Sequence, residues 1–281
     1  TKNVTVTVSK INTSISVVDK LDLIVDDGIN LNATLTPEGA GELNYSSSDE
    51  SVVCVNEIGE LTAISGGSAI VTVRFAGNDK YAAAESKNIL VTVGKLPAVI
   101  DVVSKLEMKV DEVIRLNASL TPEGAGELVY VSSDESVVTV NSLGEVTGIT
   151  GGAAIVTVKF TGNDEYSAAE SKNVLVTVAL ADASVSAENI SMTVDENVTI
   201  AATTTPEGLN ITYTADDSGV VKVENGVVTG LKEGIAKINL TVGGDNRYLL
   251  NSTTITVTVS KINTSISVAD RLDLIVDGEA D

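Results

Sequence analysis

Asparagines in the pattern Asn-x-Ser/Thr are the residues whose type and spacing most directly predict chemistry in this chain. Eleven of the 20 asparagines stand in this pattern, whereas random placement beside Ser and Thr would put about four there. The amide of such an Asn accepts N-linked glycans in secreted proteins. The candidate glycosylation sites are Asn3, Asn12, Asn32, Asn44, Asn117, Asn189, Asn197, Asn210, Asn239, Asn251 and Asn263.

The alternation of Thr with other polar residues along strands also raises the number of these patterns without any glycan. Asn is itself poor in strands, so we favour glycan attachment over this second origin. Glycans at solvent-facing strand positions would reduce aggregation and proteolysis.

Acidic and amide side chains in turns offer oxygen ligands of the kind that Ca²⁺ takes. They occur at Asp26-Asp27, at Asp216-Asp217 and in recurring Gly-Asn-Asp and Gly-Asp-Asn loops, without the spacing of an EF-hand. Asp and Asn in such places more often form turns and cap backbone groups. We therefore expect turns here, with Ca²⁺ as the alternative ligand and no other cofactor.

A tyrosine recurs beside each of these loops, as Tyr81, Tyr166 and Tyr248. A repeated tyrosine can serve as a platform for carbohydrate. We favour a packing anchor whose ring covers the edge of the core and whose hydroxyl bonds the backbone, as in a tyrosine corner.

Catalytic residues are poorly represented. The chain contains no His, and its one cysteine, Cys54, stands where the next copy of the same segment has Thr139. Carboxylate pairs for glycoside hydrolysis stay open on composition alone. However, most acidic residues recur copy by copy, and an active site is seldom triplicated, so we expect no enzyme.

An internal repeat of 85 residues organises the chain and must position these groups. Residues 32–43 return, nearly unchanged, at 117–128, and a divergent third copy carries Thr205-Pro206-Glu207-Gly208. Residues 9–17 reappear unchanged at 260–268. Residues 260–281 are therefore expected to be the opening of a fourth repeat.

The repeats predict the domain organisation. We expect the last strand of a preceding repeat at 1–8, domain 1 at 9–93, domain 2 at 94–178, a divergent domain 3 at 179–259 and the start of a further repeat at 260–281. Both ends fall inside repeats, so we expect the native polypeptide to extend in both directions.

Short alternating runs of β-branched residues, separated by Gly, Asn and Asp, predict an all-β sandwich or barrel. The expected strands of the first repeat are 13–17, 21–25, 29–35, 42–47, 51–55, 58–63, 68–75 and 88–93, and residues 81–86 read as a loop into the last of them. The junctions between repeats contain no flexible spacer, which predicts a semi-rigid rod.

The order of the motifs resembles the bacterial immunoglobulin-like domain, group 2. In that family an aromatic-Ser-Ser-Asp, a Val-x-x-Val, a Gly-x-Val-Thr and a Gly-x-Ala-x-Ile follow one another. The second repeat fits through Tyr130, Ser132, Ser133, Asp134, Val137, Val140, Gly144, Val146, Thr147, Gly152, Ala154 and Ile155. The first repeat fits equally well, and the third fits loosely, with Thr214-Ala215 in place of the serines.

A second motif, Phe75-x-Gly77-Asn78-Asp79-x-Tyr81, is similar to repeats of adhesin-like surface proteins in methanogenic archaea. The two resemblances together imply tandem immunoglobulin-like β-sandwich domains. They also imply an extracellular protein of the cell surface, often an adhesin, in which such domains act as stalks.

The charge of the chain excludes several classes of partner. The formal net charge is −21 and no Lys/Arg cluster interrupts it, so nucleic acid and anionic lipid surfaces would repel it. No apolar run approaches the ~18 residues that span a bilayer, so we expect no membrane insertion within this segment.

Two functions remain after these exclusions. We expect a non-catalytic, glycosylated stalk or fibre that supports adhesion, with neighbouring copies or other surface proteins as partners. The alternative is an adhesin binding module that recognises a glycan or protein on another cell, host or microbial. Similar loops in the first two repeats favour the stalk, and the divergent third repeat is the place to look for binding.

Overall fold

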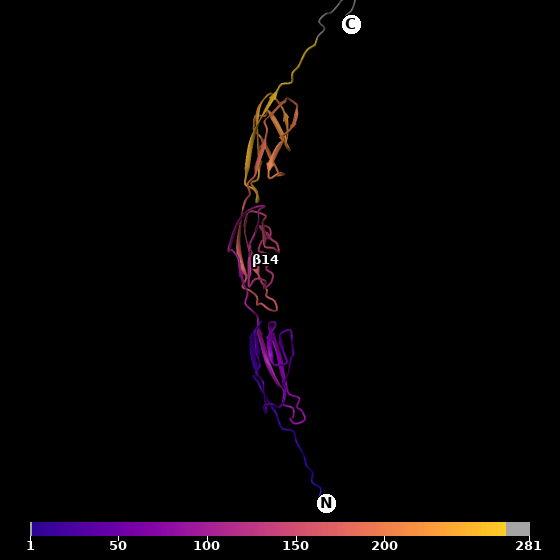
Figure 1. The fold of residues 1–281 in the computed structure, drawn as a ribbon. Helices are drawn as coiled ribbons and strands as arrows, with labels where there is room; N and C mark the ends of the chain where they lie inside the picture. The colour runs from indigo at the N-terminus through magenta and orange to yellow at the C-terminus, as the bar shows by residue number, and fades with distance from the viewer. Residues whose placement is uncertain (1, 268–281) are drawn as a thin grey trace, which may run out of the picture. The chain divides into compact units, whose positions relative to one another are not determined.

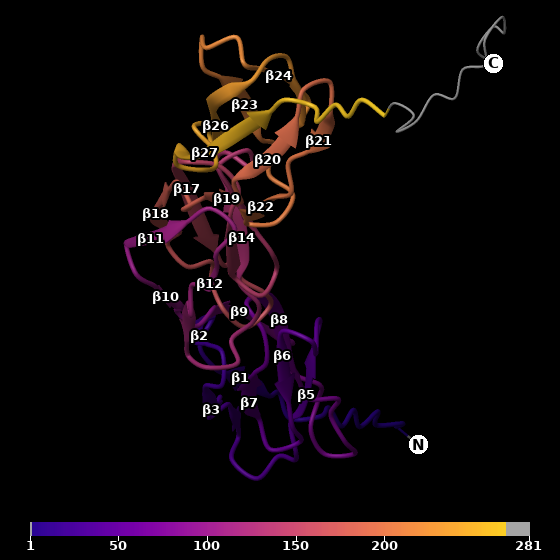
Figure 2. The same ribbon diagram turned by 90° about the horizontal axis from the view of Figure 1, so that it is seen from above.

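The computed structural model describes residues 2–267 of the chain and shows strands joined by turns and loops, without a helix in this part. Figures 1 and 2 show that the strands gather into three sandwiches that follow one another along the sequence. Each sandwich has the same three sheets, of four, three and two strands.

The first sandwich contains nine short strands. They are β1 (Ser14–Ser16), β2 (Lys20–Ile24), β3 (Gly28–Asn30), β4 (Thr34–Thr36), β5 (Asn44–Ser47), β6 (Val53–Val55), β7 (Glu60–Ala63), β8 (Gly67–Arg74) and β9 (Lys87–Gly94). Their sheets have the orders β2-β9-β8-β5, β3-β7-β6 and β1-β4.

The second and third sandwiches repeat this plan. The second has β10 (Val99–Asp101), β11 (Lys105–Lys109), β12 (Val113–Arg115), β13 (Ser119–Thr121), β14 (Val129–Ser132), β15 (Val138–Val140), β16 (Glu145–Gly148), β17 (Gly152–Lys159) and β18 (Lys172–Ala179). The third has β19 (Ser184–Ala187), β20 (Ile190–Thr193), β21 (Asn197–Thr199), β22 (Ala202–Thr205), β23 (Thr212–Ala215), β24 (Val221–Glu224), β25 (Val227–Gly230), β26 (Gly234–Val242) and β27 (Asn251–Ser260).

The four-stranded sheet combines antiparallel and parallel pairs. In the first sandwich β8 pairs antiparallel with β5 and with β9, whereas β2 runs parallel to β9, with Lys20 opposite Leu90. The third sandwich has the same parallel pair between β20 and β27. Strands β5, β14 and β23 each end their sheet and are therefore edge strands.

Alternation of side chains builds the core. In β8 the residues Ala69, Val71 and Val73 are buried, while Ile70 and Arg74 between and beside them face solvent. Buried residues from all three sheets of the first sandwich form one hydrophobic cluster. Most core side chains are Val, Ile, Leu and Ala, as the shortage of aromatic residues predicts.

A glycine packed on a tyrosine ring recurs in each sandwich. A Cβ on Gly144, whose φ is +75°, would lie 2.8 Å from Cζ of Tyr130. Gly59 stands in the same relation to Tyr45. The glycine of the Gly-x-Val-Thr motif therefore leaves room for the aromatic residue that begins the first motif.

One expected strand of the first repeat is wrong. Residues 29–35 form parts of two short strands, β3 and β4, because the extended conformation is interrupted between them at Asn32, where φ is +47°. Asn tolerates this left-handed conformation better than most residues. The expected loop at 81–86 is confirmed, since only Tyr81 in it makes a β-bridge, to Ile11.

Backbone contacts divide the chain into two compact units, and the division does not follow the repeats. The short segments Met108–Glu112 and Gly148–Gly152 of the second sandwich group with the chain from Val178 onward. The remainder of the second sandwich groups with the first. The domain bounds expected from the sequence therefore stay a prediction. None of the described residues forms a helix suited to crossing a bilayer.

Sequons, tyrosine loops and edge grooves as candidate sites

The eleven asparagines of the candidate glycosylation sites are all exposed to solvent. They do not converge on one site. Some lie in strands, such as Asn44 at the start of β5 and Asn239 in β26, and others lie in turns, such as Asn117 between β12 and β13. This scatter suits a coating of the surface and does not suit a binding pocket. Their modification stays a prediction.

Hydrogen bonds orient several of these side chains. The Oδ1 of Asn189 accepts a 2.8 Å bond from the backbone N–H of Thr256, and Oδ1 of Asn197 accepts a 2.6 Å bond from the Thr229 hydroxyl. In both residues the acceptor oxygen is held by the protein. The amide nitrogen, which is the atom that carries a glycan, is thus directed away from that contact.

The loops that lead into Tyr81, Tyr166 and Tyr248, called the tyrosine loops below, are Asx turns, each built by one side chain. The Oδ1 of Asn78 accepts bonds of 3.0 and 2.9 Å from the backbone N–H groups of Lys80 and Tyr81, and its Nδ2 donates a 2.8 Å bond to the Ala40 carbonyl. Asn163 makes the same three bonds in the second sandwich. The turn interpretation of these loops is therefore confirmed for Asn78 and Asn163.

In the third sandwich an aspartate takes this place. The Oδ1 of Asp245 accepts bonds of 2.8 Å from the backbone N–H groups of Arg247 and Tyr248. The hydrogen bond from the Tyr248 N–H, and after it the bond from the Arg247 N–H, holds the pKa of the Asp245 carboxyl below its ordinary value of 3.8.

Within the first compact unit, the loop of the second repeat contacts the end of the first repeat. The N–H of Gly66 donates a 2.8 Å bond to the carbonyl of Asp164, and the N–H of Leu96 donates a 2.9 Å bond to the carbonyl of Glu165. The ammonium of Lys95 donates to the carbonyl of Asn163. The junction is thus held by backbone groups of the loop.

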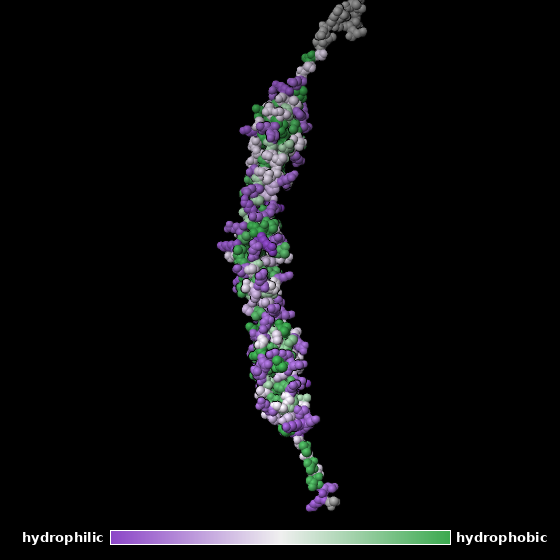
Figure 3. All heavy atoms as spheres, in the orientation of Figure 1, coloured by the Kyte–Doolittle hydropathy of each residue, from purple (hydrophilic) through white to green (hydrophobic). Residues whose placement is uncertain are grey.

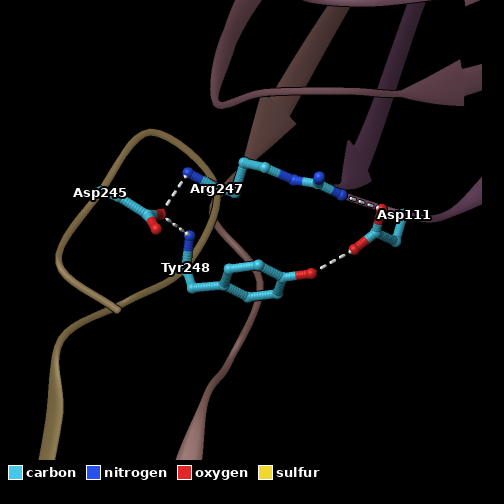
Figure 4. A network of polar contacts seen from close by, with 4 residues as sticks. All are labelled: Asp111, Asp245, Arg247 and Tyr248. Atoms are coloured by element: carbon cyan, nitrogen blue, oxygen red, sulfur yellow. Dashed lines mark hydrogen bonds and ion pairs between the residues drawn. The ribbon is translucent and has the colours of Figure 1, made fainter. Parts of the chain in front are cut away.

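Within the second compact unit, the loop of the third repeat makes the corresponding contacts and adds side chains (Figure 4). The N–H of Gly151 donates a 2.7 Å bond to the carbonyl of Asn246. The Tyr248 hydroxyl donates a 2.6 Å bond to Oδ2 of Asp111, and the Arg247 guanidinium pairs with Oδ1 of the same carboxylate. This hydrogen bond, followed by burial, raises the pKa of Tyr248 above its ordinary value of 10.0.

The role expected for the tyrosines is partly wrong. Tyr248 is buried at the edge of the core, as expected, but its hydroxyl bonds a carboxylate and not the backbone. It is the main chain of each tyrosine that pairs with the backbone, in parallel bridges from Tyr81 to Ile11, Tyr166 to Leu96 and Tyr248 to Ala181. The signal for Asp111 was present in the sequence, because a Val-Asp-acid triplet recurs at 25–27, 110–112 and 194–196.

The acidic residues considered as calcium ligands form turns. Asp26 has a φ of 72°, and Oδ2 of Asp27 accepts a 2.9 Å bond from the N–H of Ile24. Asp216 accepts bonds from the N–H groups of Ser218 and Lys237. No group of three or more His, Cys, Asp or Glu within residues 2–267 is arranged to hold a metal ion.

An open groove lies beside the edge strand of the first sandwich, and a corresponding groove lies in the second. In the first, Leu35 on β4, Tyr45 on β5 and the exposed Ile58 line it, together with Glu38 and Glu57. In the second, the counterparts Leu120, Tyr130 and Leu143 line it, together with Arg115. Sequence patterns gave no sign of these grooves, because they form between strands distant along the chain.

The geometry defines the class of protein: it is an all-β chain of immunoglobulin-like sandwiches in tandem, as predicted. Residues 98–174 match the family model of the bacterial Ig-like domain (group 2). The resemblance inferred from the motifs is therefore confirmed over that segment.

Two proteins of similar sequence are much longer than this chain. Ice-binding protein 1 of Shewanella frigidimarina is 26% identical over 263 residues, which cover 89% of this chain and 27% of that protein. An uncharacterised protein of Clostridium acetobutylicum is 27% identical over 194 residues, covering 67% of this chain and 19% of that protein. The chain thus spans about a quarter or less of these relatives.

Two solved structures align with most of this chain. Drosophila N-cadherin EC1-3 aligns with a TM-score of 0.34 and 13% identity, over 87% of this chain and 98% of that chain. Domains 1–6 of the surface layer protein SbsC align with a TM-score of 0.28 and 18% identity, over 89% of this chain and 40% of that chain.

Proposed function

We propose that this chain is part of a non-catalytic stalk or fibre on the outside of a cell, built from tandem immunoglobulin-like repeats and coated with N-linked glycans. The observation that carries the proposal is the use of the same loop in successive repeats. The loops that begin at Asn78, Asn163 and Asp245 share one Asx turn, and the second and third each bond the end of the repeat before. The loop that recurs in successive repeats thus serves to join them.

The match of residues 98–174 to the bacterial Ig-like domain (group 2) and the similarity to an ice-binding protein agree with an extracellular location. The eleven exposed sequons agree with this location, because N-linked glycans are added to secreted proteins. A strongly acidic, glycan-coated array would stay soluble outside the cell.

An antibody against residues 94–178 tests this proposal on intact cells of the source organism. Gold labelling at the outer surface, at a distance from the envelope that grows with the number of repeats in the native protein, is the expected result. Labelling only after the cells are permeabilised would refute the extracellular location. An antibody against a cytoplasmic protein of the same cells provides the control for leakage.

A binding module is the second candidate, favoured by the groove beside β5. Its exposed Ile58 and half-buried Tyr45 offer an apolar platform beside Glu38 and Glu57, of the kind that a sugar ring stacks on. An array of immobilised glycans probed with the chain tests it. Binding that is lost in Ile58→Asp but kept in Leu143→Asp would assign the ligand to the first groove.

A further inference from the structure

We propose that strand β14 of the second sandwich is a lateral docking site, at which a second copy of this chain extends the four-stranded sheet. The inference deepens the proposed function, since it names the partner with which such a stalk would bundle. It rests on the structure of β14 and on a comparison of three equivalent strands in one chain.

The first observation is that β14 is an open edge. In the order β11-β18-β17-β14 it is hydrogen-bonded to β17 on one side, with Val129 opposite Lys159 and Val131 opposite Thr157. An open edge carries backbone N–H and C=O groups ready to pair with another strand. The opposite edge, β11, is guarded by the exposed charges of Lys105 and Glu107, and charged side chains are a common protection for edges.

The second observation is an apolar surface on this edge. Tyr130 turns inward beneath Gly144, so the residues on either side of it turn outward. Val129 is 49% exposed and Val131 is 46% exposed. Behind them on the same face, Ile155 on β17 and Leu175 on β18 are also exposed. At the level of β14, Figure 3 shows hydrophobic (green) residues at the surface among hydrophilic (purple) ones.

The third observation comes from the other two edge strands. The positions of Val129 and Val131 are taken by Asn44 and Ser46 in β5, and by Thr212 and Thr214 in β23. Strand β5 begins with the sequon Asn44-Tyr45-Ser46, and the sequon Asn210-Ile211-Thr212 runs into β23.

A glycan at either asparagine would stand beside the open edge and block an incoming strand. Strand β14 carries no sequon, and the sequon of the second repeat, at Asn117, lies in the turn between β12 and β13. Two of the three equivalent edge strands therefore have a sequon beside them, and β14, the most apolar of the three, has none.

A second copy of β14 is the occupant that fits best. Two such strands, antiparallel and centred on Tyr130, would place Val129 of each copy opposite Val131 of the other. Both rows of free backbone groups would then be paired, and the valines would join in one apolar strip. The face beside the strip carries Lys105, Glu107 and Lys159, so its local charge does not share the strong negative charge of the whole chain.

A single contact of this kind is small and therefore weak, because stable interfaces bury about 1,200–2,000 Å² in total. In a longer array, however, one docked pair raises the effective concentration of the next pair. Weak edges repeated along neighbouring stalks would thus bundle them laterally without holding isolated chains together tightly.

Sedimentation velocity of the 281-residue chain over a range of concentrations, in unglycosylated and glycosylated form, tests the proposal. A concentration-dependent dimer is expected in both forms. Val131→Lys should reduce the dimer association constant at least tenfold, because it replaces part of the apolar strip with a charged side chain, the usual protection of an open edge. Thr214→Lys at the same position of β23 leaves the sequon Asn210-Ile211-Thr212 intact, so it is the matched control and should leave the dimer of the glycosylated chain unchanged.

A gain of glycan gives a second test that keeps the fold. The double variant Val129→Asn, Val131→Ser copies the Asn-Tyr-Ser of β5, a sequence that this fold already accepts at the same place. When it is glycosylated the dimer should be lost, and when it is produced without glycans the dimer should be weaker.

Three outcomes would overturn the proposal. They are a chain that is monomeric at every concentration, a dimer that survives Val131→Lys, and a dimer of the glycosylated chain that Thr214→Lys abolishes. Unchanged melting of the Val131→Lys variant shows that the loss is not a loss of folding. Surface labelling of cells, which tests the proposed function, can succeed or fail independently of these results.

Discussion

The hydroxyl of Tyr248 lies 2.6 Å from Oδ2 of Asp111, a residue 137 positions earlier in the chain. Asp111 sits in the turn after β11 with a φ of 66°, and its other carboxylate oxygen pairs with Arg247. One carboxylate of the second repeat thus receives two donors from the tyrosine loop of the third. The loop that packs its own core edge also holds the preceding repeat.

Removing the hydroxyl should weaken this junction. We expect Tyr248→Phe to lower the free energy of unfolding of the third repeat by about 1 kcal/mol, because Asp111 loses a hydrogen bond to a buried donor while it stays half exposed to water. Calorimetry of the whole chain, with the transitions assigned by fragments, measures the change. Tyr166→Phe is the control and should have a smaller effect on the junction, since the side chain that the Tyr166 hydroxyl meets is Glu165 of its own loop.

The same bond predicts a pH dependence at alkaline pH. The folded protein holds the proton of Tyr248 above its ordinary pKa of 10.0, so this stabilisation is complete below pH 10 and is lost as pH rises through the raised pKa. The difference in stability between the wild type and Tyr248→Phe should therefore shrink above about pH 10. A constant difference from pH 8 to beyond pH 11 would contradict the assigned hydrogen bond.

The aspartate of the third loop should make that loop sensitive to acid. The pKa of Asp245 is lowered in the fold, so its stabilisation is present above its ordinary pKa of 3.8 and is lost as pH falls through the lowered value. Asp245→Asn places there the residue that the other two loops already use at Asn78 and Asn163. We expect nearly unchanged melting near pH 7 and a smaller loss of stability on acidification, and an equal loss in both proteins would show that Asp245 is not the titrating group.

The glycine above the tyrosine ring should tolerate no side chain. Gly144→Ala combines a left-handed φ with a Cβ 2.8 Å from the Tyr130 ring, and we expect it to destabilise the second repeat by about 2–4 kcal/mol. Gly124→Ala separates the two causes, because its φ is +84° but no atom lies within 4 Å of the added Cβ. Urea unfolding should show a cost of about 1 kcal/mol for Gly124→Ala. Equal costs for both variants would mean that the ring is not in contact.

The sequence predicted the fold well because its evidence is local and repeated. Alternation in β8 separates Ala69, Val71 and Val73 from their exposed neighbours, and the same alternation recurs in β17 and β26. The break at Asn32 was missed, since the residues on both sides of it favour strands and only the backbone conformation of one residue interrupts them.

In the candidate sites, too, contacts between residues close in the sequence could be predicted, and contacts between distant residues could not. The Asx turns follow from short-range chemistry, since Asn78 bonds residues two and three positions later. The partner of Tyr248 did not follow, because the residue that meets it depends on which ends of two repeats come together. The bare edge of β14 was equally hidden, since a strand's place in a sheet is decided by pairing with segments far along the chain.

The contacts of the third loop also predict a dependence between neighbouring repeats. Residues 94–178 should fold alone, but residues 94–259 should show a second repeat that melts higher. The amide N–H of Gly151 and the carboxylate of Asp111 receive these partners only when the third repeat is present. Hydrogen exchange at the amide of Gly151 reports the difference, with protection expected in the longer fragment. The same exchange rates in both fragments would mean that the repeats are independent.

Brief protease treatment of intact cells, followed by mass spectrometry of the released peptides, tests the central claim most directly. The account predicts that peptides of this chain are released without cell lysis and that those containing Asn44 and Asn210 carry N-linked glycans. Peptides found only after lysis, with all eleven asparagines unmodified, would contradict it.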